Sequence, residues 1–328
     1  MIDGLVMFSG GLDSVVSTHL LKSQGLSIKA LHFVLPFYSG MGLSHERVRT
    51  YAEALDVPLM IVEEGEEFLE MIRDPRFGYG KNANPCMDCR IHRLRKARKI
   101  MESEDASFIA TGEVIGQRPM SQRLDCLYKV ESDTGLKGRL VRPLSAKLLR
   151  PSIPEQNGLI DREKLMAISG RGRNQQLQYA RTHSLKHSSP AGGCVLTNVD
   201  PARRFLEMVS SNPDFTLADF KLLAYGRHFR LGPGLKAVIA RNDSENHTLE
   251  KIFTDDDYVL QLAEVTGPCC VLRGEATLEQ LELAGAITAR YTKARNEPEV
   301  KVKVQHKGNT MILKVKPADE KECERLRV

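Results

Sequence analysis

The 328-residue chain contains no tryptophan, and Phe, Trp and Tyr together make up only 6% of it. No apolar run approaches the roughly 18 residues that a membrane-spanning helix needs, so the sequence predicts no membrane partner. Seven cysteines are too few for a disulfide scaffold in a chain of this length. The first residues, MIDGLVMFSGG, lack the basic stretch and cleavage site of a signal peptide. These absences predict a cytoplasmic protein with reduced thiols.

The chain also lacks a large excess of charge of one sign. It has 47 Lys and Arg and 42 Asp and Glu, which gives a formal net charge of +5. A surplus this small indicates a polyanionic partner only if the basic residues gather in space. They do gather along the sequence: residues 76–99 hold eight basic residues and one acidic residue. Hydrophobic residues at 41% and charged residues at 27% predict a globular protein rather than a disordered or fibrous one.

Apolar runs and helical patterns alternate through the first part of the chain. Such alternation predicts an α/β domain with a doubly wound, mainly parallel sheet. The predicted strands are residues 5–8, 28–35, 59–62 and 108–111, and the predicted helices are residues 13–24, 44–55 and 90–101.

The amino-acid composition and the predicted elements change further along the chain. Residues 143–193 are rich in Pro, Gly and Arg, with short helices predicted over 161–168 and 174–181. Short strands and a terminal hairpin, 300–304 with 311–315, then predict a smaller α+β domain. We place the domains at residues 1–204 and 205–328, with a cysteine-bearing loop near 186–196.

The most specific pattern is Ser9-Gly10-Gly11-Leu12-Asp13-Ser14, between the first predicted strand and the first predicted helix. A glycine-rich turn lets backbone N–H groups approach a phosphate, and the helix N-terminus adds partial positive charge. The lysine of a Walker A loop is missing. A tight turn capped by Ser or Asp is the alternative interpretation.

A second pattern, Asn84-Pro85-Cys86-Met87-Asp88-Cys89-Arg90, places two cysteines three residues apart at the start of a helix. Two thiols at this spacing can bind a metal or cluster, or form a redox pair. A third candidate ligand, Cys194, follows Pro190-Ala191-Gly192-Gly193, which indicates an exposed loop; a buried cysteine is the alternative.

The string from Ser9 to Ser14 resembles the PP-loop of N-type ATP pyrophosphatases, which release pyrophosphate from ATP and leave an adenylated substrate. Residues 84–90, together with Phe108-Ile109-Ala110-Thr111-Gly112-Glu113, are similar to the MnmA-type tRNA thiouridylases over residues 1–200. The pattern of that family is N-P-[DC]-x-x-C, then I-A-T-G-H, then a later loop cysteine. Glu113 stands where the family has His.

This resemblance implies a PP-loop fold of the adenine nucleotide alpha-hydrolase type and a set of site residues. Cys89 and Cys194 match the two sulfur-handling cysteines, and Asp13 is expected to assist through Mg²⁺. The expected ATP-binding residues are Ser9, Gly10, Gly11, Asp13, Ser14, Thr111 and Gly112.

The additional Cys86 leaves the route of sulfur open. A persulfide on Cys89 or Cys194 could deliver sulfur while the other thiol releases the product. Alternatively, Cys86, Cys89 and Cys194 could hold a [4Fe-4S] cluster by three irons, with the fourth iron free to bind sulfide. We favour the cluster. Zinc would also suit three thiolates but offers no evident route for sulfur.

Basic residues outside these patterns point to RNA. Arg118 and Arg123 follow a predicted strand end, where open α/β sheets bind ligands. Further on, residues 225–230 and 241–246 are similar to the NFACT-R domain, which is associated with RNA, and this similarity makes Arg227, Arg230 and Arg241 the expected RNA contacts.

Together these patterns predict an ATP-dependent tRNA sulfurtransferase that adenylates a uridine carbonyl and replaces its oxygen with sulfur. Its expected partners are tRNA and a sulfur donor, either free sulfide or a persulfide carrier protein. One alternative is an ATP pyrophosphatase that adenylates a small molecule for amidation. The other is a non-enzymatic RNA-binding protein with a structural metal site.

Overall fold

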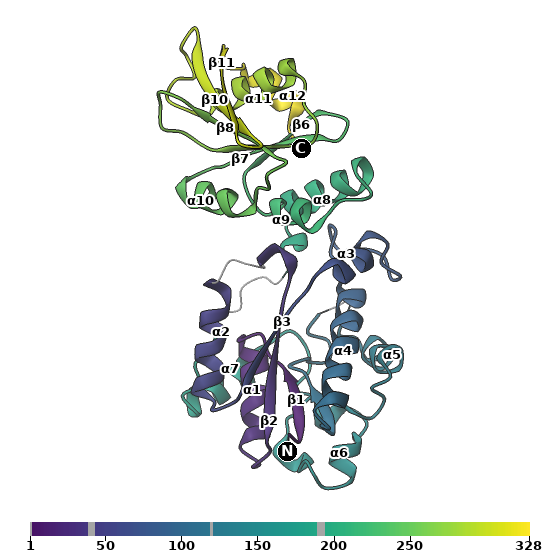
Figure 1. Ribbon diagram of the computed structural model, residues 1–328. Coiled ribbons are helices and arrows are strands. Elements are labelled where there is room, and N and C mark those ends of the chain that lie inside the picture. The colour runs from purple at the N-terminus through teal and green to yellow at the C-terminus, as the bar shows by residue number, and fades with distance from the viewer. Residues whose placement is uncertain (1, 39–42, 119–120, 189–193) are drawn as a thin grey trace. The chain divides into compact units, whose positions relative to one another are not determined.

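A computed structural model describes residues 2–38, 43–118, 121–188 and 194–328. The chain divides into two compact units, Met1–Gly193 and Cys194–Val328 (Figure 1). The boundary predicted between residues 204 and 205 falls inside helix α8 (Val199–Ser211), which therefore lies wholly in the second unit. Of the predicted cysteine-bearing loop, residues 189–193 lie outside the described residues.

The first unit is built on a five-stranded sheet in which all four pairs of neighbours are parallel. Its strand order is β3-β2-β1-β4-β5, so the chain reverses its direction of winding between β1 and β4. The strands are β1 (Gly4–Met7), β2 (Ile28–Val34), β3 (Leu59–Glu63), β4 (Phe108–Ala110) and β5 (Leu140–Val141). The predicted doubly wound parallel sheet is confirmed.

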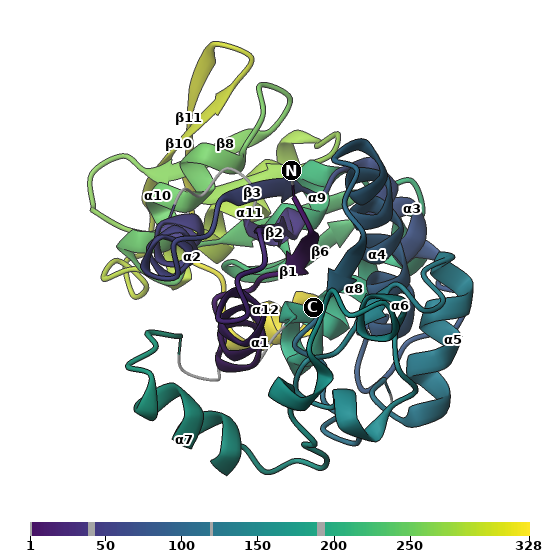
Figure 2. The ribbon, with the colours of Figure 1, turned by 90° about the horizontal axis from the view of Figure 1, so that it is seen from below.

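Helices cover both faces of this sheet. Successive strand residues point to opposite sides, so each strand contributes side chains to two hydrophobic cores. Val6 and Ala110 belong to one hydrophobic core, whereas Leu5 and Ile109 belong to the other. Figure 2 shows α1, α2 and α7 on one side of the strands and α4 and α5 on the other. The helices of this unit are α1 (Leu12–Lys22), α2 (Leu43–Ala54), α3 (Glu66–Arg73), α4 (Cys86–Ser103), α5 (Leu124–Thr134), α6 (Ile153–Gln156) and α7 (Asn174–Thr182).

The helix predicted over residues 161–168 is wrong. Only a single 3₁₀ turn, η3 (Arg162–Lys164), forms there. The backbone N–H groups of Met166 and Ile168 instead donate to the carbonyls of Pro143 and Leu144, at 2.9 and 2.8 Å. This pairing holds the segment extended, and two further 3₁₀ turns, η1 (Pro36–Tyr38) and η2 (Ala146–Leu148), complete the unit.

The second unit contains a six-stranded antiparallel sheet of order β11-β10-β8-β9-β7-β6. The terminal hairpin forms as predicted, with Val302 opposite Leu313. Helix α11 packs its buried Ala284 and Ile287 into the same core as Phe229 and Val302. The elements are η4 (Val195–Thr197), α8, α9 (Leu217–Leu222), β6 (Arg227–Gly232), β7 (Leu235–Ile239), α10 (Asp243–Ile252), β8 (Tyr258–Leu262), β9 (Cys270–Arg273), α11 (Leu278–Arg290), β10 (Val300–His306), β11 (Asn309–Val315) and α12 (Glu320–Leu326).

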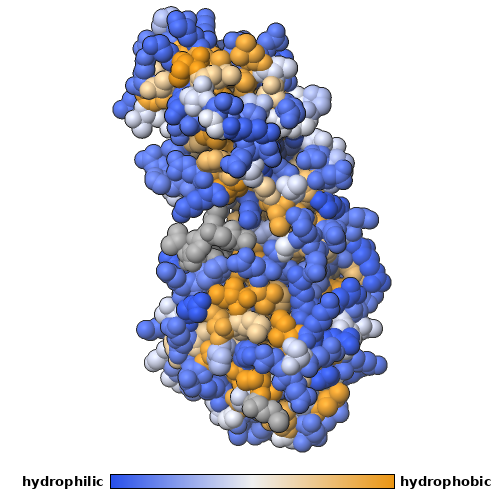
Figure 3. All heavy atoms as spheres, in the orientation of Figure 1, coloured by the Kyte–Doolittle hydropathy of each residue, from blue (hydrophilic) through white to orange (hydrophobic). Residues whose placement is uncertain are grey.

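The surface carries mostly polar side chains. Figure 3 shows a largely hydrophilic face on each unit, interrupted by smaller hydrophobic patches. Within the described ranges, none of the helices combines the length and the apolar character needed to cross a membrane.

Candidate functional site

The glycine-rich turn from Ser9 to Ser14 connects the end of β1 with the start of α1. Gly10 has a φ of +71°, a left-handed conformation that favours glycine, and a Cβ there would lie 2.9 Å from the ring of Tyr51. Ser14 Oγ donates to the carbonyl of Gly11 at 2.9 Å. The turn is thus closed by its own side chain, and the N-terminal N–H groups of α1 are left for another acceptor, as at any helix start.

Two glutamines hold Asp13, in the first turn of α1. Gln117 Nε2 donates to one carboxylate oxygen at 3.1 Å, and the fully buried Gln176 donates to the other at 3.4 Å. Arg173 Nη2 lies 4.0 Å from the same carboxylate. The contacts of Arg173 and Gln176 with Asp13 could not be predicted from the sequence, because α7 and the residue before it meet α1 only through the tertiary fold.

The ends of β1 and β4 meet at the point where the strand order reverses, which is where open α/β sheets bind ligands. Thr111 and Gly112 directly follow β4. A Cβ on Gly112 would lie 2.8 Å from backbone atoms of Asp13 and Ser14, so only glycine permits this approach. The structure therefore brings together the predicted ATP-binding residues of the PP-loop and of the segment after β4.

Both cysteines of the second pattern lie in the first turn of α4, which begins at Cys86. Asn84 Nδ2 donates to Cys86 Sγ at 2.8 Å, and Arg93 Nη2 donates to Cys89 Sγ at 2.8 Å. Burial raises the pKa of the Cys89 thiol, and the nearby Arg93 only partly offsets this effect.

A series of ion pairs connects helix α4 to the residues that follow β4. Glu113 is buried, forms an ion pair with Arg90 Nε at 2.6 Å and accepts a hydrogen bond from Arg142 Nε at 2.8 Å. Although burial raises the pKa of Glu113, Arg90 and Arg142 outweigh burial, and the net shift is downward. Arg142 also pairs with Glu131 of α5. Glu113, which stands where the MnmA family has His, therefore fixes the residue that follows Cys89.

Cys194 opens the second unit and is the residue before η4. The three cysteines predicted to act together are thus divided between the two units. Among residues 2–38, 43–118, 121–188 and 194–328, no three His, Cys, Asp or Glu side chains form a group that could hold a metal ion. None of the seven cysteines forms a disulfide.

Three of the other cysteines are buried in the second unit. Burial raises the pKa of Cys269 to about 11 and that of Cys270 to about 12, as expected for thiols inside a sheet. Cys323 is buried against the same core as Cys270. Cys126 of α5 is partly exposed.

The predicted RNA contacts differ in how their charge is balanced. Arg118 and Arg123 are both exposed, and Arg123 pairs with Asp125 at 3.1 Å. Arg230 of β6 pairs with Glu207 at 2.6 Å, and Arg241 pairs with Glu245.

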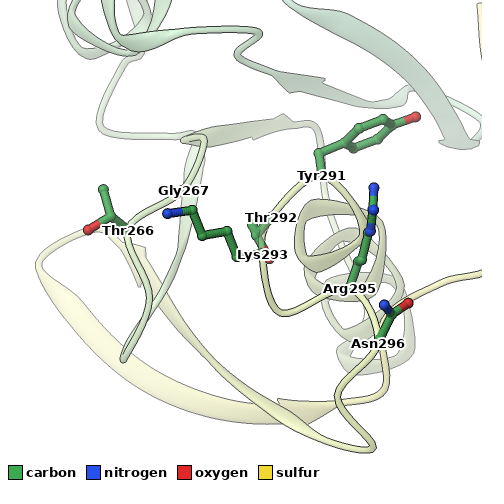
Figure 4. A pocket seen from close by; sticks show the side chains of 7 residues that line it. All are labelled: Thr266, Gly267, Tyr291, Thr292, Lys293, Arg295 and Asn296. Carbon is green, nitrogen blue, oxygen red and sulfur yellow. The ribbon is translucent and has the colours of Figure 1, made fainter.

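Arg227 lies over the ring of Tyr291, 4.5 Å from its centroid, and donates to the carbonyl of Ala240 at 3.1 Å. Tyr291 also lines a cavity of about 520 Å³ with Lys293 and Arg295 (Figure 4). The remaining lining residues are Thr266, Gly267, Thr292 and Asn296. A stacked guanidinium beside a cationic hollow is a surface that can receive an anion.

Comparison with known proteins divides the chain in the same way. Residues 2–147 match the family model described as thiamine biosynthesis protein (ThiI), and residues 226–327 match the NFACT protein RNA binding domain. The tRNA-specific 2-thiouridylase MnmA of Sulfurimonas denitrificans is 32% identical over 138 residues, which are 40% of this chain and 38% of that protein. MnmA of Petrotoga mobilis is 31% identical over 128 residues, 34% of this chain and 35% of that protein.

The chain thus spans little more than a third of the length of these curated relatives. Among solved structures, the U34-tRNA thiolase NcsA from Methanococcus maripaludis with its [4Fe-4S] cluster is 14% identical, with 68% of this chain and 69% of that chain covered. Its TM-score of 0.31 is too low to support an inference.

Proposed function

We propose that this chain, which combines a PP-loop domain of the ThiI type with an NFACT-type RNA-binding domain, is an ATP-dependent tRNA sulfurtransferase. One observation carries the proposal. Gly112 touches the PP-loop, and the adjacent Glu113 binds Arg90, the residue after Cys89. Two consecutive residues at the reversal point of one parallel sheet therefore contact the glycine-rich turn and the helix that carries the two thiols, which supports a site shared by a nucleotide and these thiols.

The PP-loop would bind the phosphates of ATP. Ser9, Gly10, Gly11 and Ser14 offer backbone N–H groups and hydroxyls at the start of α1, where the helix dipole favours an anion. Thr111 and Gly112 border the same turn. Asp13 would hold Mg²⁺ together with phosphate oxygens and water, a ligand set that suits this ion. Its two amide partners, Gln117 and Gln176, keep the carboxylate in place without supplying an opposite charge.

The first chemical step is adenylation. The carbonyl oxygen of a tRNA uridine attacks the α-phosphorus of ATP, and pyrophosphate leaves from the opposite side. The N–H groups of the PP-loop stabilise the charge that develops on the departing pyrophosphate. In the second step a sulfur nucleophile adds to the activated carbon, and AMP departs with the former carbonyl oxygen. The product carries a thiocarbonyl.

Cys89 and Cys194 would handle the sulfur, with Cys86 as a third thiol. The N–H donors to the sulfur atoms of Cys86 and Cys89 are of the kind that surround iron–sulfur clusters. Cys86 and Cys89 of the first unit would hold two irons of a [4Fe-4S] cluster and Cys194 would hold the third, and the cluster would provide an open iron for sulfide when bound. The described part of the first unit ends at Ser188, whose N–H donates to the Gly10 carbonyl at 2.9 Å.

Anaerobically purified protein, incubated with ATP, tRNA and sulfide, tests the proposal. We expect release of pyrophosphate that depends on tRNA, and a thiolated nucleoside detected by mass spectrometry. Cys89→Ala should abolish thiolation, whereas the matched Cys126→Ala, also a partly exposed cysteine of the first unit, should retain it. Pyrophosphate release that depends on a small amine acceptor instead of tRNA would support the amidating alternative and overturn the proposal.

A further inference from the structure

Five arginines gather at the β6 edge of the second unit. Two belong to α8 and one begins β6, while the fourth follows β7 and the fifth follows α12. Phe229 of β6 forms a backbone bridge with Arg327, and the N–H of Val328 donates to the His228 carbonyl at 3.0 Å. Arg203 Nη2 donates to the Val328 carbonyl at 3.1 Å. We call these residues the arginine cluster: Arg203, Arg204, Arg227, Arg241 and Arg327.

Arg204 is the buried centre of the arginine cluster, with 5% of its surface exposed. Its Nη1 donates to the Leu223 carbonyl at 3.2 Å, but its buried Nε has no hydrogen-bond partner among the described residues. Burial lowers the pKa of Arg204 to about 10, and the charges of Arg241, Arg203 and Arg327 contribute to that shift. A buried guanidinium normally has a carboxylate or another anion beside it.

The carboxylates near the arginine cluster are too few to balance it. Glu245 pairs with Arg241 and also accepts from the N–H groups of Gly226 and Arg241, at 3.2 and 2.8 Å. Asp200 lies 3.6 Å from Arg203 in an exposed pair. Among the described residues, two side-chain carboxylates and the main-chain oxygen of Val328, which Arg203 contacts, therefore face five guanidinium groups. The neighbouring His228 does not alter this balance, because burial holds its pKa well below the ordinary value.

A hollow adjoins the arginine cluster. A cavity of about 430 Å³ is lined by Arg203 and Arg327, together with Glu207, Arg230, Arg325, Leu326 and Val328. Glu207 is already paired with Arg230 and Lys236, at 2.6 and 3.0 Å. The excess positive charge at this edge thus comes from the arginine cluster rather than from Arg230, which the sequence had suggested as an RNA contact.

We propose that the arginine cluster is a built phosphate site that holds the sugar–phosphate backbone of the RNA substrate. Arg203, Arg241 and Arg327 contact the phosphodiester, and Arg204 stabilises it from behind. Guanidinium groups are suited to this task because they present several N–H donors in one plane. The site reads no base, so its contribution is independent of sequence. The identity of the RNA as tRNA rests on the proposed function.

The test is RNA binding by the full chain. The triple variant Arg203→Gln/Arg241→Gln/Arg327→Gln should bind fluorescently labelled tRNA on the order of ten- to a hundred-fold more weakly at about 0.15 M salt. The slope of log K against log salt should fall by about 0.7–0.9 for each lost phosphate contact. Thermal melting of both proteins establishes that the variant is folded.

A matched variant on the opposite side of the sheet controls for net charge. Lys301→Gln/Lys314→Gln/Lys316→Gln removes the same charge from exposed positions on and directly after β10 and β11. It should change the affinity for tRNA by less than about three-fold. Equal loss in both triple variants, or no loss in the arginine variant, overturns the proposal.

Titration with inorganic phosphate and pyrophosphate separates the possible sources of phosphate. If these ions bind to the wild type and not to the arginine variant, while both proteins bind tRNA equally, the site serves a free anion and the proposal is overturned. The thiolation assay is independent of this result. Wild-type protein that binds tRNA through the arginine cluster but never thiolates it would leave the phosphate site standing and remove the proposed function.

Discussion

Among the residues that the structure describes, each unit buries one arginine, and the two are in opposite electrostatic situations. Arg142 of the first unit is 2% exposed and donates to the carboxylates of Glu113 and Glu131 and to the Leu127 carbonyl. Burial lowers the pKa of Arg142, but the two carboxylates raise it by more, so the net shift of the pKa is upward. Arg204 of the second unit is 5% exposed and has other guanidinium groups around it.

The difference between these two residues separates a structural charge from a functional one. Arg142 is complete within the fold, because its partners lie just after β4 and in α5 of the same unit. Arg204 is incomplete, because an anion from outside would supply what the fold does not. Buried ions without partners cost free energy, so their persistence points to a ligand. Variants of the two arginines, and of the carboxylate that serves the first, can break or sharpen this contrast.

The largest effect is expected for Arg142→Met. This change leaves Glu113 with one cation instead of two and deprives Glu131 of its buried partner, so we expect a loss of about 3–5 kcal/mol in the free energy of unfolding. Urea denaturation at neutral pH measures it. Lys22→Met, which removes an exposed pair with Asp56, is the matched control and should cost less than about 1 kcal/mol. Equal losses would refute the structural role of Arg142.

Glu113→Gln should have the next largest effect, about 2–3 kcal/mol near pH 7, because Arg90 and Arg142 lose the charge between them. The effect should depend on pH. Although burial raises the pKa of Glu113, the two arginines lower it below 4.5 overall, so the folded protein binds fewer protons than the unfolded chain below that pH. The stability that the carboxylate contributes is therefore present above about pH 4.5 and is lost as the pH falls through the folded-state pKa.

Measuring the free energy of unfolding of both proteins from pH 7 to pH 3 checks this prediction. The difference between wild type and Glu113→Gln should shrink in the acid part of that range. A difference that stays constant with pH would show that the Glu113 side chain acts through its shape and not through its charge.

Arg204→Met should have the smallest effect on stability, no more than about 1 kcal/mol in either direction. The variant loses one hydrogen bond to the Leu223 carbonyl but also relieves the repulsion from Arg203, Arg241 and Arg327. Urea denaturation without any anion present measures it. A loss as large as that of Arg142→Met would mean that Arg204 is a structural ion after all, and the contrast between the two units would disappear.

Much of the first unit could be predicted from the sequence, because its signals are local. The strands with Val6, Leu31 and Ile109 are short apolar runs, and the turn from Ser9 to Ser14 has a specific residue pattern. The two cysteines of α4 were placed at a helix start for the same reason. The predicted helix over 161–168 failed because its hydrogen bonds go to Pro143 and Leu144, a tertiary pairing that no local pattern reveals.

The contacts that organise the candidate sites could not be predicted, because they join residues far apart in the chain. Gln176 reaches Asp13 across 163 positions, and Arg142, the residue after β5, reaches Glu113. Arg204 and Arg327 had no motif to mark them, and only the tertiary fold brings Arg327 close to both Arg227 and Arg204. Arg230 shows the converse, since its motif was visible but its partner Glu207 was not.

The close approach of Gly112 to the first turn of α1 has a consequence for how this chain tolerates change. Any side chain at this position would press on the backbone of Asp13 and Ser14 and move the neighbouring Glu113 at the same time. In a library that varies every position singly, Gly112 should therefore accept no replacement, not even alanine, while sites a few residues away remain permissive. A single missing methyl group thus keeps the turn from Ser9 to Ser14 and helix α4 at a fixed spacing.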